Sequence, residues 1–266
     1  MGEETTWFSL LPGVKNLEAF SRQYLARTQV GIAQFPSSFS LTHVFGVVLV
    51  LILGTFGALI FYRAMAKGGE HAIVPPTRLN VRNIFELFAD AVYGVMESVL
   101  GAKNARQYLP LIGTIAFFIF FSNCLALIPG FVPPTAVLKT NAALALTVFV
   151  MTHVYGVRQH GLSYFKHFLG PVIWLAPFMV LIEIISHIAR PVSLSIRLLG
   201  NMFADHKVVG VFFTLVPILV PVPFLILGVL VCIIQAFVFT LLAMVYIQGA
   251  VAEHDHGDEA HAHEAH

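Results

Sequence analysis

The stretch "VPFLILGVLVCIIQAFVFTLLAMVYIQGA", residues 222–250, contains no aspartate, glutamate, lysine or arginine. A helix of this length is roughly 43 Å long, whereas the hydrocarbon core of a bilayer is about 30 Å thick. The stretch therefore predicts a membrane-spanning helix, and its excess length predicts a strong tilt. The whole chain agrees, because 58% of its 266 residues are hydrophobic and only 11% are charged. Its near-zero net charge gives no reason to expect a nucleic acid as partner.

Four further apolar stretches precede this one, at residues 41–62, 108–128, 141–157 and 170–216. The last of them would form a helix of roughly 70 Å, which again exceeds the bilayer core. It contains Pro191, which can kink a membrane helix without ending it, because neighbouring groups satisfy the freed carbonyl. We therefore expect an all-α, polytopic membrane protein with about five membrane-crossing helices. The last two, within residues 170–250, are expected to form a long and strongly tilted hairpin.

Residues 80–101 show a different pattern. Apolar residues recur at helical spacing, at Ile84, Leu87, Phe88, Ala91, Val95 and Val99, while Glu86, Asp90 and Glu97 fall on another arc. This pattern predicts one amphipathic helix that lies on the membrane surface or against partner helices. An ordinary surface helix would show nearly the same pattern.

The distribution of lysine and arginine predicts the orientation of the chain. Residues 63–107 carry six of them and residues 158–167 carry two, whereas residues 129–140 carry one. The positive-inside rule places the two richer connections on the cytoplasmic side. The N-terminal segment, residues 1–40, is then outside, and the C-terminus is cytoplasmic. This fits a bacterial plasma (inner) membrane, although an organelle membrane would also satisfy it.

These boundaries divide the chain into an N-terminal outside segment, a membrane domain at residues 41–250 and a tail at residues 251–266. The tail, which includes "EHDHGDEAHAHEAH", is acidic and rich in histidine. Weak metal binding is one interpretation of it, but it has no tetrahedral ligand spacing. A disordered, solvated cytoplasmic tail is the simpler interpretation.

Polar residues recur along one face of the fourth apolar stretch. Glu183, His187, Arg190, Arg197 and Asn201 all fall within about 40° of one line at 100° per residue. A charged residue at the centre of a membrane helix costs about 2.5–3.5 kcal/mol, so each needs a compensating interaction. Arg190 can be neutralised by Glu183 at the adjacent turns, or its long side chain can reach the membrane surface.

Arg197 has no carboxylate one turn away, and a guanidinium does not lose its proton in a protein. The last stretch offers Gln235 and Tyr246, which are 11 positions apart and share a face. Gln235 can hydrogen-bond to Arg197 but cannot neutralise it. The missing negative charge is most simply supplied by a partner subunit.

Three segments resemble the subunit a family of F-type ATP synthases. They are "RPVSLSIRLLGNMFADH" (190–206), "IIQAFVFTLLAMVYI" (233–247) and "FFSNCLALIPGFVPPTA" (120–136), and the likeness covers most of residues 80–250. The resemblance implies the stator of a rotary motor, packed against a ring of c subunits that each carry one membrane carboxylate. It implies further contact with the peripheral-stalk b subunits, indirect contact with the ATPase sector (F₁), and the lipid bilayer as surroundings. No cofactor, metal or catalytic residue of its own is implied.

The resemblance also implies roles for individual residues. Arg197 matches the essential arginine between two offset half-channels, through which protons reach and leave the ring carboxylates. Asn201 and Gln235 match its polar neighbours. Glu183 and Ser186 match the cytoplasmic-side path, and Asn123 matches a position near the outer-side path. His187, one turn from Glu183, has either a path role or a structural one.

The sequence departs from the family pattern at two positions. Many bacterial members carry an acidic residue nine positions after the arginine, where this chain has His206 preceded by Asp205. Many also carry a histidine or acid seven positions before the glutamine, where this chain has Gly228. We expect Asp205 and His206 to serve the outer half-channel instead, since histidine titrates near neutral pH. The alternative is a charged kink in a water-filled cavity.

The choice between H⁺ and Na⁺ as the transported ion is set largely by the ring, which is not in this chain.

Two other classes of protein fit less well. A self-contained secondary transporter is expected to show related halves with broken helices, and the sequence shows no internal repeat. An intramembrane enzyme needs a nucleophile with its base, or an H-E-x-x-H helix, and neither is present.

Overall fold

The computed structural model describes Val14, Asn16 and residues 42–68, 81–128, 131–161, 164, 176–215 and 221–252. Within these residues all secondary structure is helical and there is no strand. The same residues contain five helices that are long and apolar enough to cross a membrane. This confirms the all-α, polytopic fold. The expected His-rich tail beyond Ala252, and residues 1–40 apart from Val14 and Asn16, lie outside the described residues.

The described elements follow the apolar stretches of the sequence. They are α2 (Thr42–Gly68), α3 (Val81–Leu125), the 3₁₀ helix η3 (Pro134–Ala136), α4 (Leu138–His160), α6 (Ala176–Leu215) and α7 (Pro221–Ala252). Helix α6 continues through Pro191, as expected for a membrane helix whose freed carbonyl finds other partners.

The amphipathic helix ends at residue 101 as predicted, because the chain kinks at Gly101, but the connection expected between it and the second span is absent. Residues 102–107, expected as a polar connection, are helical, and α3 runs from Val81 to Leu125 with one non-helical residue, Gly101 (φ 77°, ψ 156°). This backbone conformation is essentially restricted to glycine. Gly101 thus turns the chain by itself, and the next helix starts at once. We call residues 81–100 the first arm of α3 and residues 102–125 the second arm.

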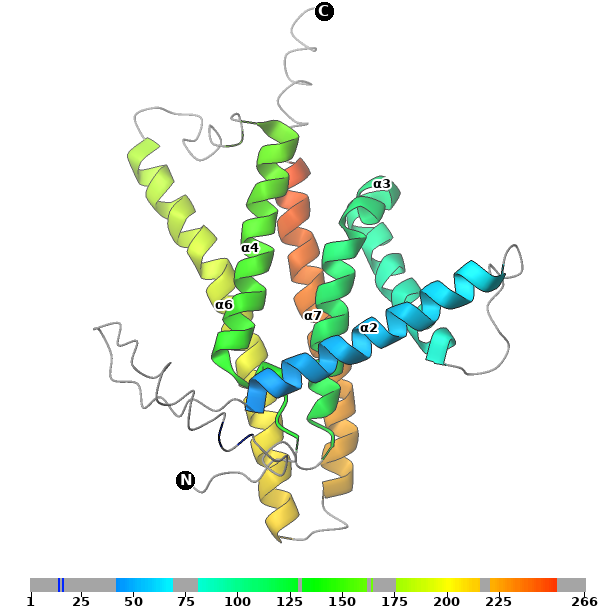
Figure 1. The fold of residues 1–266 in the computed structure, drawn as a ribbon. Helices are drawn as coiled ribbons and strands as arrows, with labels where there is room; N and C mark the ends of the chain where they lie inside the picture. Colours follow the sequence, from blue (N-terminus) through cyan, green and yellow to red (C-terminus); the bar gives the residue numbers. More distant parts are fainter. Residues whose placement is uncertain are drawn as a thin grey trace, which may run out of the picture.

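Helices α6 and α7 run antiparallel, and α7 lies between the second arm of α3 and α4 (Figure 1). With 40 and 32 residues, α6 and α7 are about 60 Å and 48 Å long, which exceeds a hydrocarbon core of about 30 Å. Helix α2 crosses the other helices at a steep angle (Figure 1). Consequently α2 and the α6–α7 hairpin cannot both stand along the membrane normal. A helix as long as α6 fits within the hydrocarbon core only when it is inclined, which keeps the expected tilt of the hairpin as a prediction.

The core joins the second arm of α3 to α4, α6 and α7. Its buried members are Ile115, Ile119, Ala145, Val148, Leu194, Leu198, Ala236, Phe239 and Ala243. Three of the nine are alanine, and small residues let membrane helices approach closely, which strengthens van der Waals packing where no hydrophobic drive remains. This packing fixes α6 against α7 at the level of Leu194 and Leu198.

Helix α2 contacts α3 through glycine and phenylalanine. A Cβ atom at Gly57 would lie 2.1 Å from the Phe85 ring, and one at Gly54 would lie 2.8 Å from the Phe117 ring. The Phe85 ring is stacked on Phe117 and Phe121, with centroids 5.4 and 5.9 Å away. Because these rings support each other, Phe85 has little freedom to move aside.

We therefore expect Gly57→Ala to destabilise the protein, by about 1–3 kcal/mol, through overpacking. The matched control is Gly94→Ala, because a Cβ there meets nothing within 4 Å. Alanine favours a helix over glycine by about 1 kcal/mol, so the control is expected to be neutral or stabilising. Thermal unfolding of both variants in detergent measures the difference. Equal melting temperatures would refute the tight α2–α3 contact.

Candidate functional site

One side-chain hydrogen bond joins the middle of α6 to α7. The Asn201 Nδ2 amide donates to Gln235 Oε1 at 2.6 Å. Gln235 is buried, with 3% of its surface exposed, so an unpaired amide oxygen there would be costly. The sequence suggested that Gln235 can hydrogen-bond to Arg197. In the structure the Gln235 side-chain carbonyl instead accepts the hydrogen bond of Asn201, which lies one turn after Arg197 on α6.

Arg197 lies on the exposed side of α6. Its neighbours Leu194 and Leu198 are buried in the core, whereas Arg197 and Ile196 are exposed. Among the side chains that the structure describes, Arg197 has no hydrogen bond and no ion pair. Its charge is therefore presented outward, from a helix anchored on its other side.

A second polar group lies on α6 nearer its start. His187 Nδ1 is 2.9 Å from the Glu183 carbonyl oxygen and 3.3 Å from Glu183 Oε1. Since both of these atoms accept, Nδ1 carries the hydrogen. Glu183 and Arg190 form no ion pair within the described part of the chain, so the structure does not bear out neutralisation by Glu183, one of the two alternatives for Arg190. The Glu183 carboxylate faces His187 at the closer spacing of one turn.

Arg190 contacts an aromatic ring instead. Its guanidinium carbon lies 5.5 Å from the centroid of the Tyr246 ring on α7. At this distance the ring face attracts the cation, by about 0.5–2 kcal/mol depending on desolvation. Tyr246 is thus a partner of Arg190, at some distance along α7 from Gln235.

His153 on α4 belongs to this group, although the pattern of the sequence did not indicate it. Its ring centroid lies 5.2 Å from that of His187, and its Nδ1 donates to the Phe149 carbonyl oxygen at 2.8 Å. The feature of the sequence that could have indicated it is the presence of a histidine inside the apolar stretch 141–157. A small cavity of about 20 Å³ is lined by both histidines, Arg190 and Tyr246. One water needs about 10–15 Å³, so the cavity is large enough for one.

Asn123 belongs to a third polar group, where α3 ends. Thr135 Oγ1 donates to Asn123 Oδ1 at 2.7 Å, and Asn141 Nδ2 donates to the Thr135 carbonyl oxygen at 2.7 Å. Asn123, Thr135 and Asn141 are fully buried. Asn123 Nδ2, Asn141 Oδ1 and Ser122 Oγ have no hydrogen-bond partner within the described residues. Such a group has a strong affinity for water or another polar species.

The other predicted residues are placed less fully. Ser186 is half-buried on α6, next to His187. Asp205 and His206 belong to α6, but their side chains lie outside the described part of the structure. The structure therefore brings together Asn201 with Gln235, Glu183 with His187, and Arg190 with Tyr246. It bonds Asn123 to η3 rather than to either of these groups.

This arrangement defines a class: a multi-pass helical membrane protein with an outward-facing arginine and internal polar groups on its last two helices. The model of the ATP synthase A chain family matches residues 43–248. ATP synthase subunit a 1 of Syntrophotalea carbinolica is 53% identical over 213 residues, which cover 80% of this chain and 87% of the relative. ATP synthase subunit a of Geobacter sulfurreducens is 51% identical over 173 residues, which cover 65% of this chain and 75% of the relative. The chain belongs to the ATP synthase A chain family.

A double-mutant cycle on Asn201→Ala and Gln235→Ala tests the α6–α7 hydrogen bond. We expect a coupling of about 0.6 kcal/mol, the average for such bonds between membrane helices, with about 1.7 kcal/mol as an upper bound. The measurement is the unfolding free energy of the two single variants and the double variant in bicelles. Strict additivity would show that this bond does not hold the helices together.

Proposed function

We propose that the chain is the stator subunit a of the F₀ sector of an F-type ATP synthase. In this role it provides two offset half-channels that load and unload protons on the c-ring carboxylates, and Arg197 separates them. Proton flow is thereby coupled to ring rotation and ATP synthesis. The observation that carries the proposal is the exposed Arg197, which has no partner among the described residues of its own chain.

The surface around Arg197 supports a protein partner. The stretches of α6 and α7 that contain Arg197 and Gln235 also expose apolar side chains, namely Val192, Ile196, Phe203, Ile233, Ile234 and Phe237. In such surroundings an arginine is costly unless an opposite charge reaches it. A ring of helices that each carry one carboxylate supplies both the apolar contact and the charge.

The electrostatics of Arg197 then account for its two tasks. A fixed positive charge next to a passing carboxylate favours the ionised form, so it helps to remove the proton. The same charge repels a hydrated proton and cannot relay one, because the guanidinium does not titrate. Direct leakage between the half-channels is blocked. One charge crossing the membrane gains about 2.3 kcal/mol per 100 mV, and this energy becomes torque only when the leak is closed.

The polar groups supply candidate paths on the two sides. Glu183, Ser186 and His187 are assigned to the cytoplasmic-side path, with Arg190 and Tyr246 beside them. The buried Asn123 is assigned to the outer-side path, and its unpaired Nδ2 supports a polar route at that position. Asp205 and His206 are assigned to the same side from the sequence alone.

The wider assembly follows from this role. The partners are the c-subunit ring and the peripheral-stalk b subunits, with the F₁ sector contacted indirectly. The chain itself is a membrane subunit that binds no nucleotide and catalyses no reaction. The basic connections support an orientation with the N-terminus outside and the C-terminus cytoplasmic, in a bacterial plasma membrane. The relatives come from bacteria, which agrees with this location.

ATP-driven acidification of inverted membrane vesicles tests the role of Arg197. Arg197→Ala is expected to abolish pumping, while the assembled complex remains detectable. Arg158→Ala, which removes an exposed arginine from α4, is the matched control and is expected to pump normally. Passive proton flow, measured on the same membranes, identifies any leak. Normal pumping by Arg197→Ala would mean that the arginine is structural and that the proposed mechanism is wrong.

The proposed role of His206 is tested with one substitution that keeps a titrating group at this position and one that removes it. His206→Glu restores the acidic residue common in the family and is expected to retain most pumping, because a carboxylate can also relay protons. His206→Leu removes the titrating group and is expected to lower pumping by about 100-fold or more, the lower end of general acid–base effects. If both variants pump at the wild-type rate, His206 is excluded from the proton path.

A further inference from the structure

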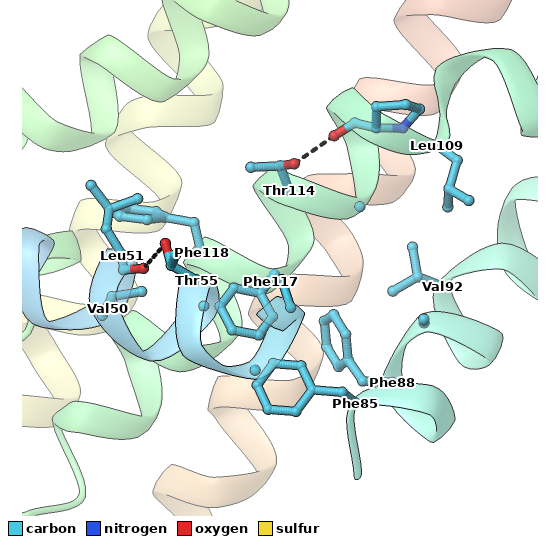
Figure 2. A pocket seen from close by; sticks show the side chains of 16 residues that line it. Val50, Leu51, Thr55, Phe85, Phe88, Val92, Leu109, Thr114, Phe117 and Phe118 are labelled. Atoms are coloured by element: carbon cyan, nitrogen blue, oxygen red, sulfur yellow. Dashed lines mark hydrogen bonds between the residues drawn. The ribbon is translucent and has the colours of Figure 1, made fainter. Parts of the chain in front are cut away.

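A large apolar hollow lies away from the polar groups, between α2 and the two arms of α3. Its volume is about 500 Å³, within the range of about 300–1,000 Å³ typical of ligand pockets. Figure 2 shows the side chains that line it, with Phe85, Phe88 and Phe117 at one end and Val92 facing Leu109 across the space between the arms. Nothing in the proposed ion path uses this hollow.

The hollow offers no free side-chain hydrogen-bond donor to a ligand inside it. The two hydroxyl-bearing residues in its lining, Thr55 and Thr114, each donate to a carbonyl of their own helix. Thr55 donates to Leu51 at 2.8 Å and Thr114 to Pro110 at 2.5 Å, as the dashed lines in Figure 2 show. All other lining side chains are apolar. The occupant must therefore be hydrocarbon.

The helices around the hollow exclude a partner helix. Helix α2 already touches both arms, through Gly57 on Phe85 and Gly54 on Phe117. An α-helix with its side chains is about 10–12 Å across, so inserting one would separate these contacts. A flexible acyl chain needs no such separation.

Two basic side chains, Lys103 and Arg106, lie on the same face of the second arm of α3 as residues that line the hollow. Lys103, Arg106, Pro110, Gly113 and Phe117 follow one another at intervals of three and four residues, which places them on one helix face. The last three line the hollow, and the first two are exposed. The first arm carries three acidic residues. Glu86 is already paired with Arg82 of the same arm at 3.1 Å. Asp90 and Glu97 lie roughly 130–150° away from the mean direction of the arm's lining residues around that helix. The charge next to the hollow is therefore positive.

We propose that this hollow is a binding site for an anionic phospholipid. One acyl chain fills the space between α2 and the arms of α3, and the headgroup phosphate meets Lys103 and Arg106. Both cations lie in the connection that the positive-inside rule places at the cytoplasmic surface, where anionic headgroups are found. The bound lipid holds α2 against α3 at a place where protein packing leaves a gap.

The test uses the full-length chain, purified from its own membrane in mild detergent with its bound subunits. Native mass spectrometry counts retained phosphatidylglycerol, and after delipidation compares its rebinding with that of phosphatidylcholine of the same acyl chains. Wild type is expected to prefer phosphatidylglycerol. Arg106→Gln is expected to lower that affinity about fivefold, the effect of one basic side chain near an anionic headgroup, whereas the control Arg158→Gln leaves it unchanged.

A second pair of variants tests the acyl-chain site. Gly113→Leu projects into the hollow, where a Cβ meets only Leu109 at 3.6 Å, so it fills the site without a forced clash. Gly94→Leu adds the same bulk to the first arm of α3, where a Cβ meets nothing within 4 Å. Gly113→Leu is expected to lose the retained lipid and Gly94→Leu to keep it.

Three results would overturn the proposal. Equal lipid retention by Gly113→Leu and Gly94→Leu would mean that the hollow holds no chain. Equal binding of the two phospholipids would remove the anionic headgroup from the site. Loss of a bound subunit from Gly113→Leu, with lipid retention unchanged, would identify a protein segment as the occupant.

Discussion

A guanidinium that cannot release its proton, set among exposed apolar side chains of α6, is the constraint on which the rest of the structure depends. Arg197 is useful only if its position is fixed, because a flexible arginine would fold back to the membrane surface. Two contacts fix the α6 helix on either side of Arg197. Leu194 and Leu198 are buried against α4 and α7, and Asn201 is hydrogen-bonded to Gln235. The charge is held by its neighbours along the helix rather than by a partner of its own.

The polar groups near the start of α6 follow a different principle, since they compensate one another inside the protein. Glu183 accepts from His187, His187 stacks edge-on against His153, and Arg190 lies over Tyr246. Pro191 has no N–H, so it leaves the His187 carbonyl without its usual helix donor, which adds another acceptor at this level. Three helices contribute to one small polar space. Arg197, only two turns further on, shares none of these contacts, and this contrast separates an internal polar cluster from a charge that has no contact among the described side chains.

Hydropathy and helical periodicity were sufficient to predict most of the fold, because five apolar stretches of spanning length leave few alternatives. Two features were beyond them. Gly101 turns α3 through a backbone conformation that only glycine tolerates, and neither its neighbours nor the polar residues after it indicate that the next helix starts at once. The pairing of side chains was also beyond the sequence. A stripe of polar residues indicates which residues share a face, but whether Glu183 meets Arg190 or His187, and whether Gln235 meets Arg197 or Asn201, depends on distances of a few ångströms between helices. His153 was missed because its partner lies on another helix.

The inclination of the hairpin connects these local features. Glu183 and Arg197 are 14 residues apart, hence about 21 Å along α6. In an upright helix this distance would be a difference in depth and would cover most of a hydrocarbon core of about 30 Å. In an inclined helix, part of this distance becomes a sideways displacement within the membrane. On an inclined helix, a polar region near Glu183 and another near Arg197 can therefore open to opposite membrane surfaces. The two regions stay laterally apart, and Arg197 lies beyond the reach of the groups around Glu183. Length beyond the bilayer thickness, which is the plainest property of the sequence, is what makes that lateral separation possible.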